Sequence, residues 1–88
     1  MLTVIEEIRV SEIIDKEREI YPRLDEAWEA LKWWLARRPD SGVLLDDIHW
    51  LFKQIGDPEA KIPTLVVIYR WDEFVVIDHV LVRIPSYS

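Results

Sequence analysis

The stretch Thr64–Ile84 decides the fold of this chain, and it reads TLVVIYRWDEFVVIDHVLVRI. It is crowded with β-branched and aromatic residues, which favour strands, and its only polar break wide enough for a turn is Asp72-Glu73. The stretch is therefore predicted to form a β-hairpin. A two-residue turn implies that Trp71 pairs with Phe74, Tyr69 with Val76, and Val67 with Asp78.

In this register both faces of the hairpin are apolar. One face is predicted to carry Leu65, Val67, Tyr69, Trp71, Phe74, Val76 and Val80, and the other Val66, Ile68, Val75, Ile77 and Leu81. A sheet with one face in water would instead alternate apolar and polar residues. In 88 residues, helices can cover one of these faces. The other face needs a loop, a second copy of the chain or a different protein.

Size and composition predict a single domain over residues 1–88. Half of the residues are hydrophobic, which excludes a disordered chain, and the absence of cysteine excludes disulfides and thiolate metal sites. The net charge of −6 disfavours a general nucleic-acid binder. The N-terminus does not have the pattern of a signal peptide, and no apolar run approaches the roughly 20 residues of a membrane span. We therefore expect a cytoplasmic protein without membrane contact.

In the rest of the chain, a short first strand and two helices are predicted to come before the other strands. The expected elements are a short strand at 2–6, helices at 11–21 and 23–38, an extended piece at 43–45, a strand at 48–55 and a loop at 56–63. Ser11 is a plausible N-cap for the first helix. The predicted fold class is α+β, with an N-terminal helical hairpin packed on a three- to four-stranded antiparallel sheet.

The second helix carries the clearest pattern in the chain. Its core stripe follows helical spacing and consists of Leu24, Ala27, Trp28, Leu31 and Leu35. At about 100° per residue, Trp34 falls on the flank of this stripe and Trp33 on the opposite side of the helix. Because tryptophan is enriched at interface hot spots, Trp33 is a candidate binding residue, although it can also be simply exposed.

Few residues suggest chemistry. The two histidines, His49 and His79, are predicted to be structural, and Asp46-Asp47 to stabilise a turn; neither a metal nor a cofactor is expected. The polar residues of the β half are Lys53, Arg70, Arg83 and Tyr87. If they converge on one side of the sheet, cations and a tyrosine would suit metal-independent RNA cleavage. The alternative is that these residues lie at edges and surfaces and keep an apolar sheet soluble.

Several segments, taken in order, resemble the RelE/ParE superfamily of bacterial toxins. They are the opening Thr3–Glu6, the helical hairpin, the helix end Leu35–Gly42 (LARRPDSG, similar to L-A-x-x-P-x-x-G), and the strands Ile68–Trp71 and Phe74–Val80. The resemblance covers most of the chain and rests on the order and spacing of these segments. It implies the same α+β fold as the residue patterns.

The resemblance also implies a function. Such toxins belong to type II toxin–antitoxin modules, and they cut mRNA on the ribosome or inhibit DNA gyrase until an antitoxin packs on them. By this resemblance Lys53, Arg83 and Tyr87 would be catalytic. The candidate binding residues, Trp33 and Arg70, come from the residue patterns instead, Trp33 from its helical position and Arg70 from its place in the β half. Val66 stands where the family would place an arginine. A ribonuclease, a gyrase inhibitor, a purely protein-binding member and a module that homodimerises through its sheet or Trp33 therefore all stay open.

Overall fold

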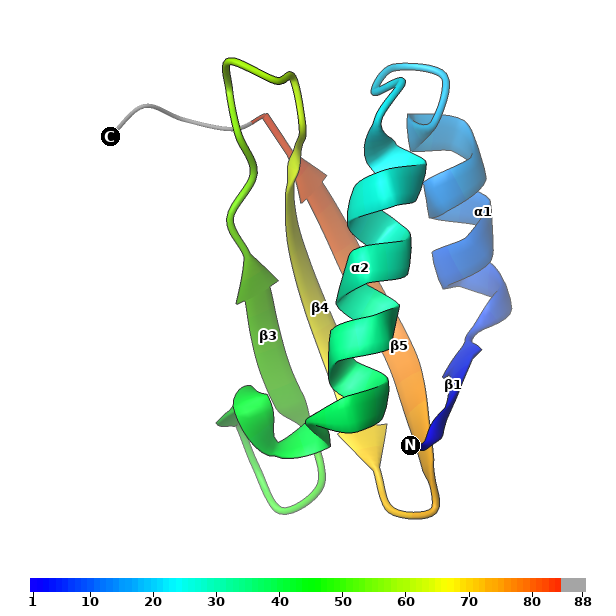
Figure 1. Cartoon of the computed structure of the whole chain (residues 1–88). Helices are drawn as coiled ribbons and strands as arrows, with labels where there is room; N and C mark the ends of the chain where they lie inside the picture. The colour runs from blue at the N-terminus through cyan, green and yellow to red at the C-terminus, as the bar shows by residue number, and fades with distance from the viewer. Residues whose placement is uncertain (85–88) are drawn as a thin grey trace.

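The computed structural model describes residues 1–84, and its class is α+β as expected (Figure 1). The elements are β1 (Thr3–Glu6), α1 (Ile8–Glu17), α2 (Leu24–Arg37), the 3₁₀ turn η1 (Pro39–Ser41), β2 (Val43–Leu44), β3 (Trp50–Gln54), β4 (Thr64–Trp71) and β5 (Phe74–Arg83). The second helix and the short extended piece after it agree with the sequence prediction to within one residue at each end.

The sheet is larger than predicted, and it is mixed. It has five strands in the order β1-β5-β4-β3-β2, where three or four were expected. All neighbouring strands are antiparallel except β1, which runs parallel to β5 over Thr3–Glu6. The prediction of an antiparallel sheet was therefore wrong at this edge. The two helices return the chain to the start of the sheet, so β1 can lie beside β5 in the same direction.

The predicted register of the β4–β5 hairpin was wrong by one residue. Trp71 pairs with Val75, because the connection contains three residues rather than two, and Tyr69 pairs with Ile77. A bulge then leaves Asp78 without a partner, so Val67 pairs with Val80. A shift of one residue moves side chains to the other face. Val75 and Ile77 therefore face the helices, and Phe74 and Val76 face away, the reverse of the prediction.

One face of the sheet packs against the helices. Figure 1 shows α2 crossing in front of the strands, with α1 beside it near β1. The buried core consists of Val10, Ile14, Leu24, Ala27, Trp28, Leu31 and Leu35 from the helices and Leu65, Val67, Tyr69, Val75, Ile77 and Val80 from the sheet. No helix among residues 1–84 combines the length and apolar character needed to cross a membrane.

The first helix begins earlier than predicted. It starts at Ile8 instead of Ser11, with Glu7 at the N-cap, so Ser11 does not cap it. The Ser11 hydroxyl instead donates to the Glu6 carboxylate at 3.4 Å. Burial explains the shift, because an earlier start lets the helix bury Val10 together with Ile14.

Candidate functional site

The side of the sheet that the helices do not cover, which we call the open face, is largely apolar. It lies behind the strands in the view of Figure 1. The strand pairing assigns to it Ile5, Val43, Leu51, Val66, Ile68, Phe74, Val76 and Leu81. Four of these, Ile5, Val43, Phe74 and Leu81, are 42–66% exposed. An exposed apolar surface of this kind is a candidate interaction site.

Two predicted catalytic residues lie at one end of the open face. Lys53 on β3 lies across from Val66, and Arg83 on β5 lies across from Thr64, so both side chains share this face. They are two strands apart and offset by two residues, which places their Cα atoms about 12 Å apart. Both are exposed, and neither forms an ion pair with another of residues 1–84. We call this pair the basic end. Tyr87 lies outside the described residues.

Arg70, predicted to bind a ligand, lies on the open face but away from the basic end. Its position on β4 is four residues beyond Val66, about 13 Å along the strand. Its guanidinium donates from Nε to Asp78 at 3.0 Å and lies 3.8 Å from Glu7. The His49 ring lies 3.9 Å from the same Asp78 carboxylate. Arg70 therefore belongs to a charged cluster of Glu7, His49, Arg70 and Asp78.

The turn before β3 fixes His49 in this cluster. Asp46 accepts backbone hydrogen bonds from Ile48 and His49 at 2.8 and 2.7 Å, and its carboxylate lies 2.9 Å from His49 Nδ1. These two backbone bonds, followed by the His49 side chain, lower the Asp46 pKa to about 2. The turn-stabilising role of Asp46 is thus confirmed, and His49 is a structural residue as predicted.

The cluster lines an open hollow of about 610 Å³ beside the start of α1. Besides His49 and His79, its ionisable residues are the two cations Arg9 and Arg70 and the three carboxylates of Glu7, Glu12 and Asp78. Carboxylates thus outnumber cations, and Arg70 already binds two of them, which disfavours phosphate here. The His79 side chain is exposed and forms no hydrogen bond with another of residues 1–84, so the expectation of a satisfied structural histidine was wrong.

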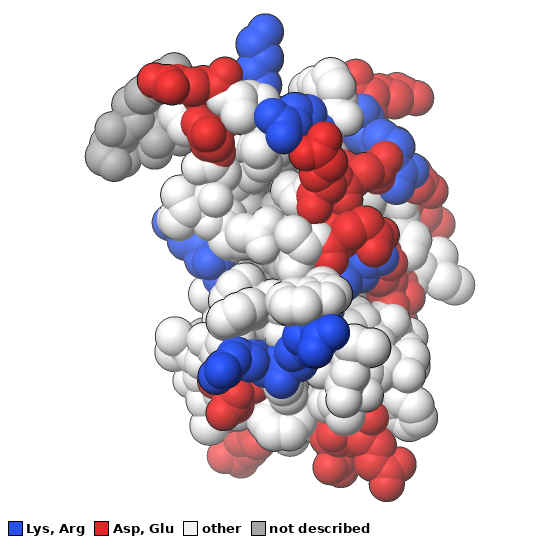
Figure 2. All heavy atoms as spheres, in the orientation of Figure 1, with Lys and Arg blue, Asp and Glu red and all other residues white. Residues whose placement is uncertain are grey.

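Trp33 lies on the other side of the molecule, as the helical spacing predicts. Its side chain is 54% exposed on α2, and the Arg37 guanidinium lies 4.2 Å from the ring centre. Trp34 is less exposed, and its indole N–H donates to Ser41 at 3.0 Å. Figure 2 looks onto this side and shows Lys and Arg over the lower part of α2, with Asp and Glu gathered over the upper right.

The charged cluster was not found from the sequence. It depends on the bulge at Asp78 and on the hydrogen-bonded turn before β3. A continuous apolar strand pattern indicates neither the bulge nor the turn. The spacing of Asp46 and His49, three residues apart before a strand, was the one available signal. Residues 1–84 contain no group of three or more His, Cys, Asp or Glu side chains that could hold a metal ion.

The low pKa of Asp46 predicts a specific effect in acid. Because the folded pKa of about 2 lies below the ordinary 3.8, the charged Asp46 stabilises the folded state above pH 3.8, and this stabilisation is lost as the pH falls toward 2. Asp46→Asn should therefore be less stable than the wild type at pH 7, and the gap should close between pH 3.8 and 2. Urea unfolding midpoints across this range measure the gap, with Asp47→Asn as control. A difference in unfolding midpoint between the wild type and Asp46→Asn that stays constant across this pH range would contradict the prediction.

Comparison with known proteins gives no relative: no family model, no curated protein and no solved structure matches this chain.

Proposed function

We propose that this chain is a toxin-like component of a bacterial type II toxin–antitoxin module that acts through protein contacts on its open face. The observation that carries the proposal is a five-stranded sheet covered by helices on one side only. Half-buried and exposed apolar side chains on the other side, among them Ile68, Val76 and Leu81, provide the contact surface. The order of segments that resembles RelE/ParE toxins supports the choice of module.

The partner that fits this face is an antitoxin segment with apolar side chains and at least one carboxylate. The apolar side chains would cover the centre of the sheet, where burial of exposed area drives association. The carboxylate would lie over Lys53 and Arg83, whose charges have no ion-pair partner within residues 1–84. Charge complementarity of this kind sets the orientation of a partner more than it adds affinity.

A second activity, metal-independent RNA cleavage, is favoured by one observation. Lys53 and Arg83, the two catalytic candidates within residues 1–84, share one face and one end of the sheet. Two cations there would stabilise the charge that develops on a phosphoryl group. The excess of acid over the whole chain works against affinity for a polyanion such as RNA. Protein contact is therefore the primary proposal, and cleavage is the second.

Growth arrest on expression tests the proposal. The chain expressed alone should stop growth, and Leu81→Asp should abolish the arrest, because it places a negative charge on the apolar contact surface, beside Val66. Leu81 is 52% exposed, so the variant should fold. Ile20→Asp, at a residue 65% exposed beyond the end of α1, is the matched control and should still arrest growth. Harmless expression of folded wild type, or full toxicity of Leu81→Asp, would overturn the proposal.

The basic end separates the two activities. If the protein cleaves RNA, Lys53→Ala and Arg83→Ala should each abolish growth arrest while the unfolding midpoint stays unchanged. Lys16→Ala and Arg38→Ala remove exposed cations elsewhere and serve as controls. Unchanged arrest in both basic-end variants would exclude the cleavage mechanism and leave the protein-contact mechanism standing.

A further inference from the structure

We propose that two copies of this chain associate through the outward surface of α2, in an antiparallel arrangement centred between Leu31 and Lys32. The surface consists of Glu26, Ala30, Trp33 and Arg37, which we call the α2 stripe. At about 100° per residue these four positions fall within an arc of about 60° on the side of the helix away from the sheet. All four are exposed.

The α2 stripe is complementary to itself. When two such helices pack antiparallel about this centre, Ala30 lies against the partner's Trp33, and Glu26 lies against the partner's Arg37. Both contacts occur twice, as a two-fold axis requires. The small side chain of Ala30 leaves room for a tryptophan ring to approach the helix, where interaxial distances are about 8–10 Å.

The charges select this direction of packing. Glu26 lies near the start of α2, and among residues 1–84 its carboxylate pairs only with Arg23, at 2.8 Å on the exposed surface. Arg37 lies near the end of the helix, where it stacks on Trp33 at 4.2 Å and has no carboxylate partner among residues 1–84. A parallel arrangement would place Glu26 on Glu26 and Arg37 on Arg37, which is repulsive. The antiparallel one places opposite charges together at both ends.

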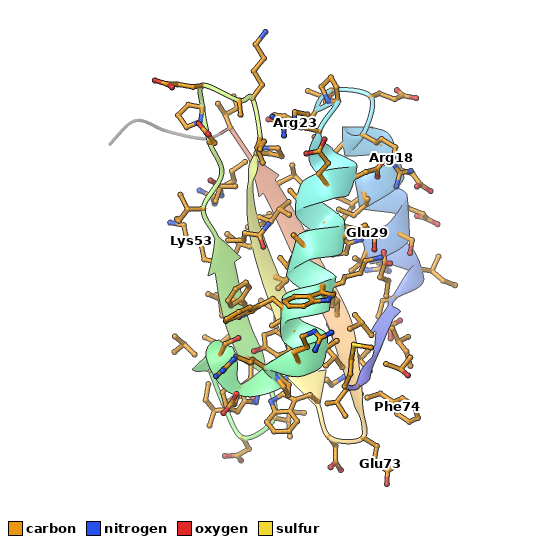
Figure 3. All side chains as sticks on the ribbon, in the orientation of Figure 1. Arg18, Arg23, Glu29, Lys53, Glu73 and Phe74 are labelled. Atoms are coloured by element: carbon orange, nitrogen blue, oxygen red, sulfur yellow. The ribbon has the colours of Figure 1, made fainter. Side chains whose placement is uncertain are left out.

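The arrangement also explains why an exposed Trp is tolerated. An interface core formed by two tryptophans, each already stacked on an arginine, has the composition of binding hot spots. In Figure 3 the labelled Glu29 lies toward α1, beside the stripe, where its carboxylate holds Lys32 at 3.0 Å. The four residues of each copy form a contact below the standard of about 800 Å² per partner, so the dimer should be weak and should dissociate on dilution.

Sedimentation over about 10 µM to about 1 mM tests the dimer, a range that spans weak association. The wild type should shift from monomer to dimer across this range, whereas Trp33→Ala and Ala30→Glu should remain monomeric. Leu81→Asp lies on the open face and should dimerise like the wild type. If Leu81→Asp abolished the dimer and Trp33→Ala did not, the sheet would be the interface and the proposal would fail. A wild type that stays monomeric at the highest concentration would also overturn it.

Charge exchange gives the sharper test. Glu26→Arg alone and Arg37→Glu alone should each be monomeric, because each places like charges at both ends of the contact. Mixing these two single variants should restore a dimer, since every contact is then between opposite charges. The double variant Glu26→Arg/Arg37→Glu should also dimerise. Equal behaviour of the single variants and the wild type would contradict the pairing. Unlike growth arrest, these measurements do not involve the open face, so the two proposals can fail separately.

Discussion

Trp28→Ala is expected to lower the free energy of unfolding by about 3–5 kcal/mol, the largest loss from a single core substitution in this chain. Trp28 is 2% exposed and packs within the core formed by α2 and the sheet. Its indole N–H also donates to the Glu6 carboxylate on β1 at 3.1 Å. The substitution therefore leaves a cavity and removes a hydrogen bond that ties the edge strand to the helix.

The expected loss is large compared with the total. A domain of this length has a free energy of unfolding of about 4–13 kcal/mol, and at the lower end of this range Trp28→Ala would be marginally folded or unfolded at room temperature. Trp28→Phe separates the two contributions, because it keeps an aromatic ring in the core and removes the hydrogen bond to Glu6, which is worth about 1–2 kcal/mol. Urea unfolding gives both values, and Trp33→Ala on the exposed side serves as control. Equal midpoints for Trp28→Ala and Trp33→Ala would contradict this account of the core.

Glu6 shows why the Trp28 hydrogen bond matters beyond its own energy. The same carboxylate accepts from Lys32 at 3.0 Å and from Ser11 at 3.4 Å, so it connects β1 to both helices. Burial lowers the pKa of Lys32, but the hydrogen bonds to Glu29 and Glu6 outweigh it, so the pKa of Lys32 is raised overall. When the indole is removed, Glu6 keeps these partners. The stability lost in Trp28→Ala therefore reports mainly the lost packing, and not the cost of leaving the Glu6 carboxylate without partners.

The α2 helix could be predicted from the sequence because its signal is local. Apolar residues at helical spacing fixed the buried side, and the same spacing placed Trp33 outward, as the structure shows. The α2 stripe follows from this pattern once exposure is known. The first helix was placed less well, since the prediction began it at Ser11 and so left Val10 outside it. Burial of Val10 requires the sheet, which local spacing does not describe.

The open face could be predicted only in outline. An excess of apolar residues in the β4–β5 hairpin correctly indicated that one face of the sheet lacks a cover. Which residues belong to that face depended on the register. The three-residue turn reversed the assignment of Val75 and Val76, and the bulge at Asp78 restored the predicted faces of Val80 and Leu81. Apolar residues on both faces give no preference between neighbouring registers. The location of Arg70 beside Glu7 depended on the parallel β1, which no pattern in β5 indicates.

The turn at Gly42 connects α2 to β2 and the loop that carries His49. Gly42 lies directly before β2, and its N–H donates to the Tyr69 hydroxyl at 3.1 Å. That hydroxyl in turn donates to the Pro39 carbonyl at 2.6 Å. Burial raises the pKa of the Tyr69 phenol, so it remains a donor at neutral pH. Tyr69 is fully buried, so this turn is fixed to the core of the sheet.

Gly42→Ala is expected to lower the free energy of unfolding by about 2–3 kcal/mol, because a β-carbon there has no room. It would lie 2.5 Å from the Leu51 carbonyl oxygen and 2.6 Å from the Tyr69 hydroxyl, so β2 must move away from β3. Tyr69→Phe alone should cost about 1–3 kcal/mol, since it removes the partner of both the Gly42 N–H and the Pro39 carbonyl.

The double variant Gly42→Ala/Tyr69→Phe decides whether the hydroxyl contact causes the loss. Tyr69→Phe removes the hydroxyl oxygen, one of the two atoms that the new β-carbon of Gly42→Ala would crowd. The hydrogen bond between Gly42 and Tyr69 is already broken in each single variant, so the double variant does not lose it a second time. The double variant should therefore lose at least about 1 kcal/mol less than the sum of the single losses. Unfolding midpoints are measured for the wild type, both single variants and the double variant. Val43→Ala, at the exposed neighbouring position, is the control. If the losses add, the Leu51 carbonyl accounts for the crowding and Tyr69 does not fix the turn. If the losses do not add, the buried Tyr69 hydroxyl fixes the loop that brings His49 to Asp78 on the open face.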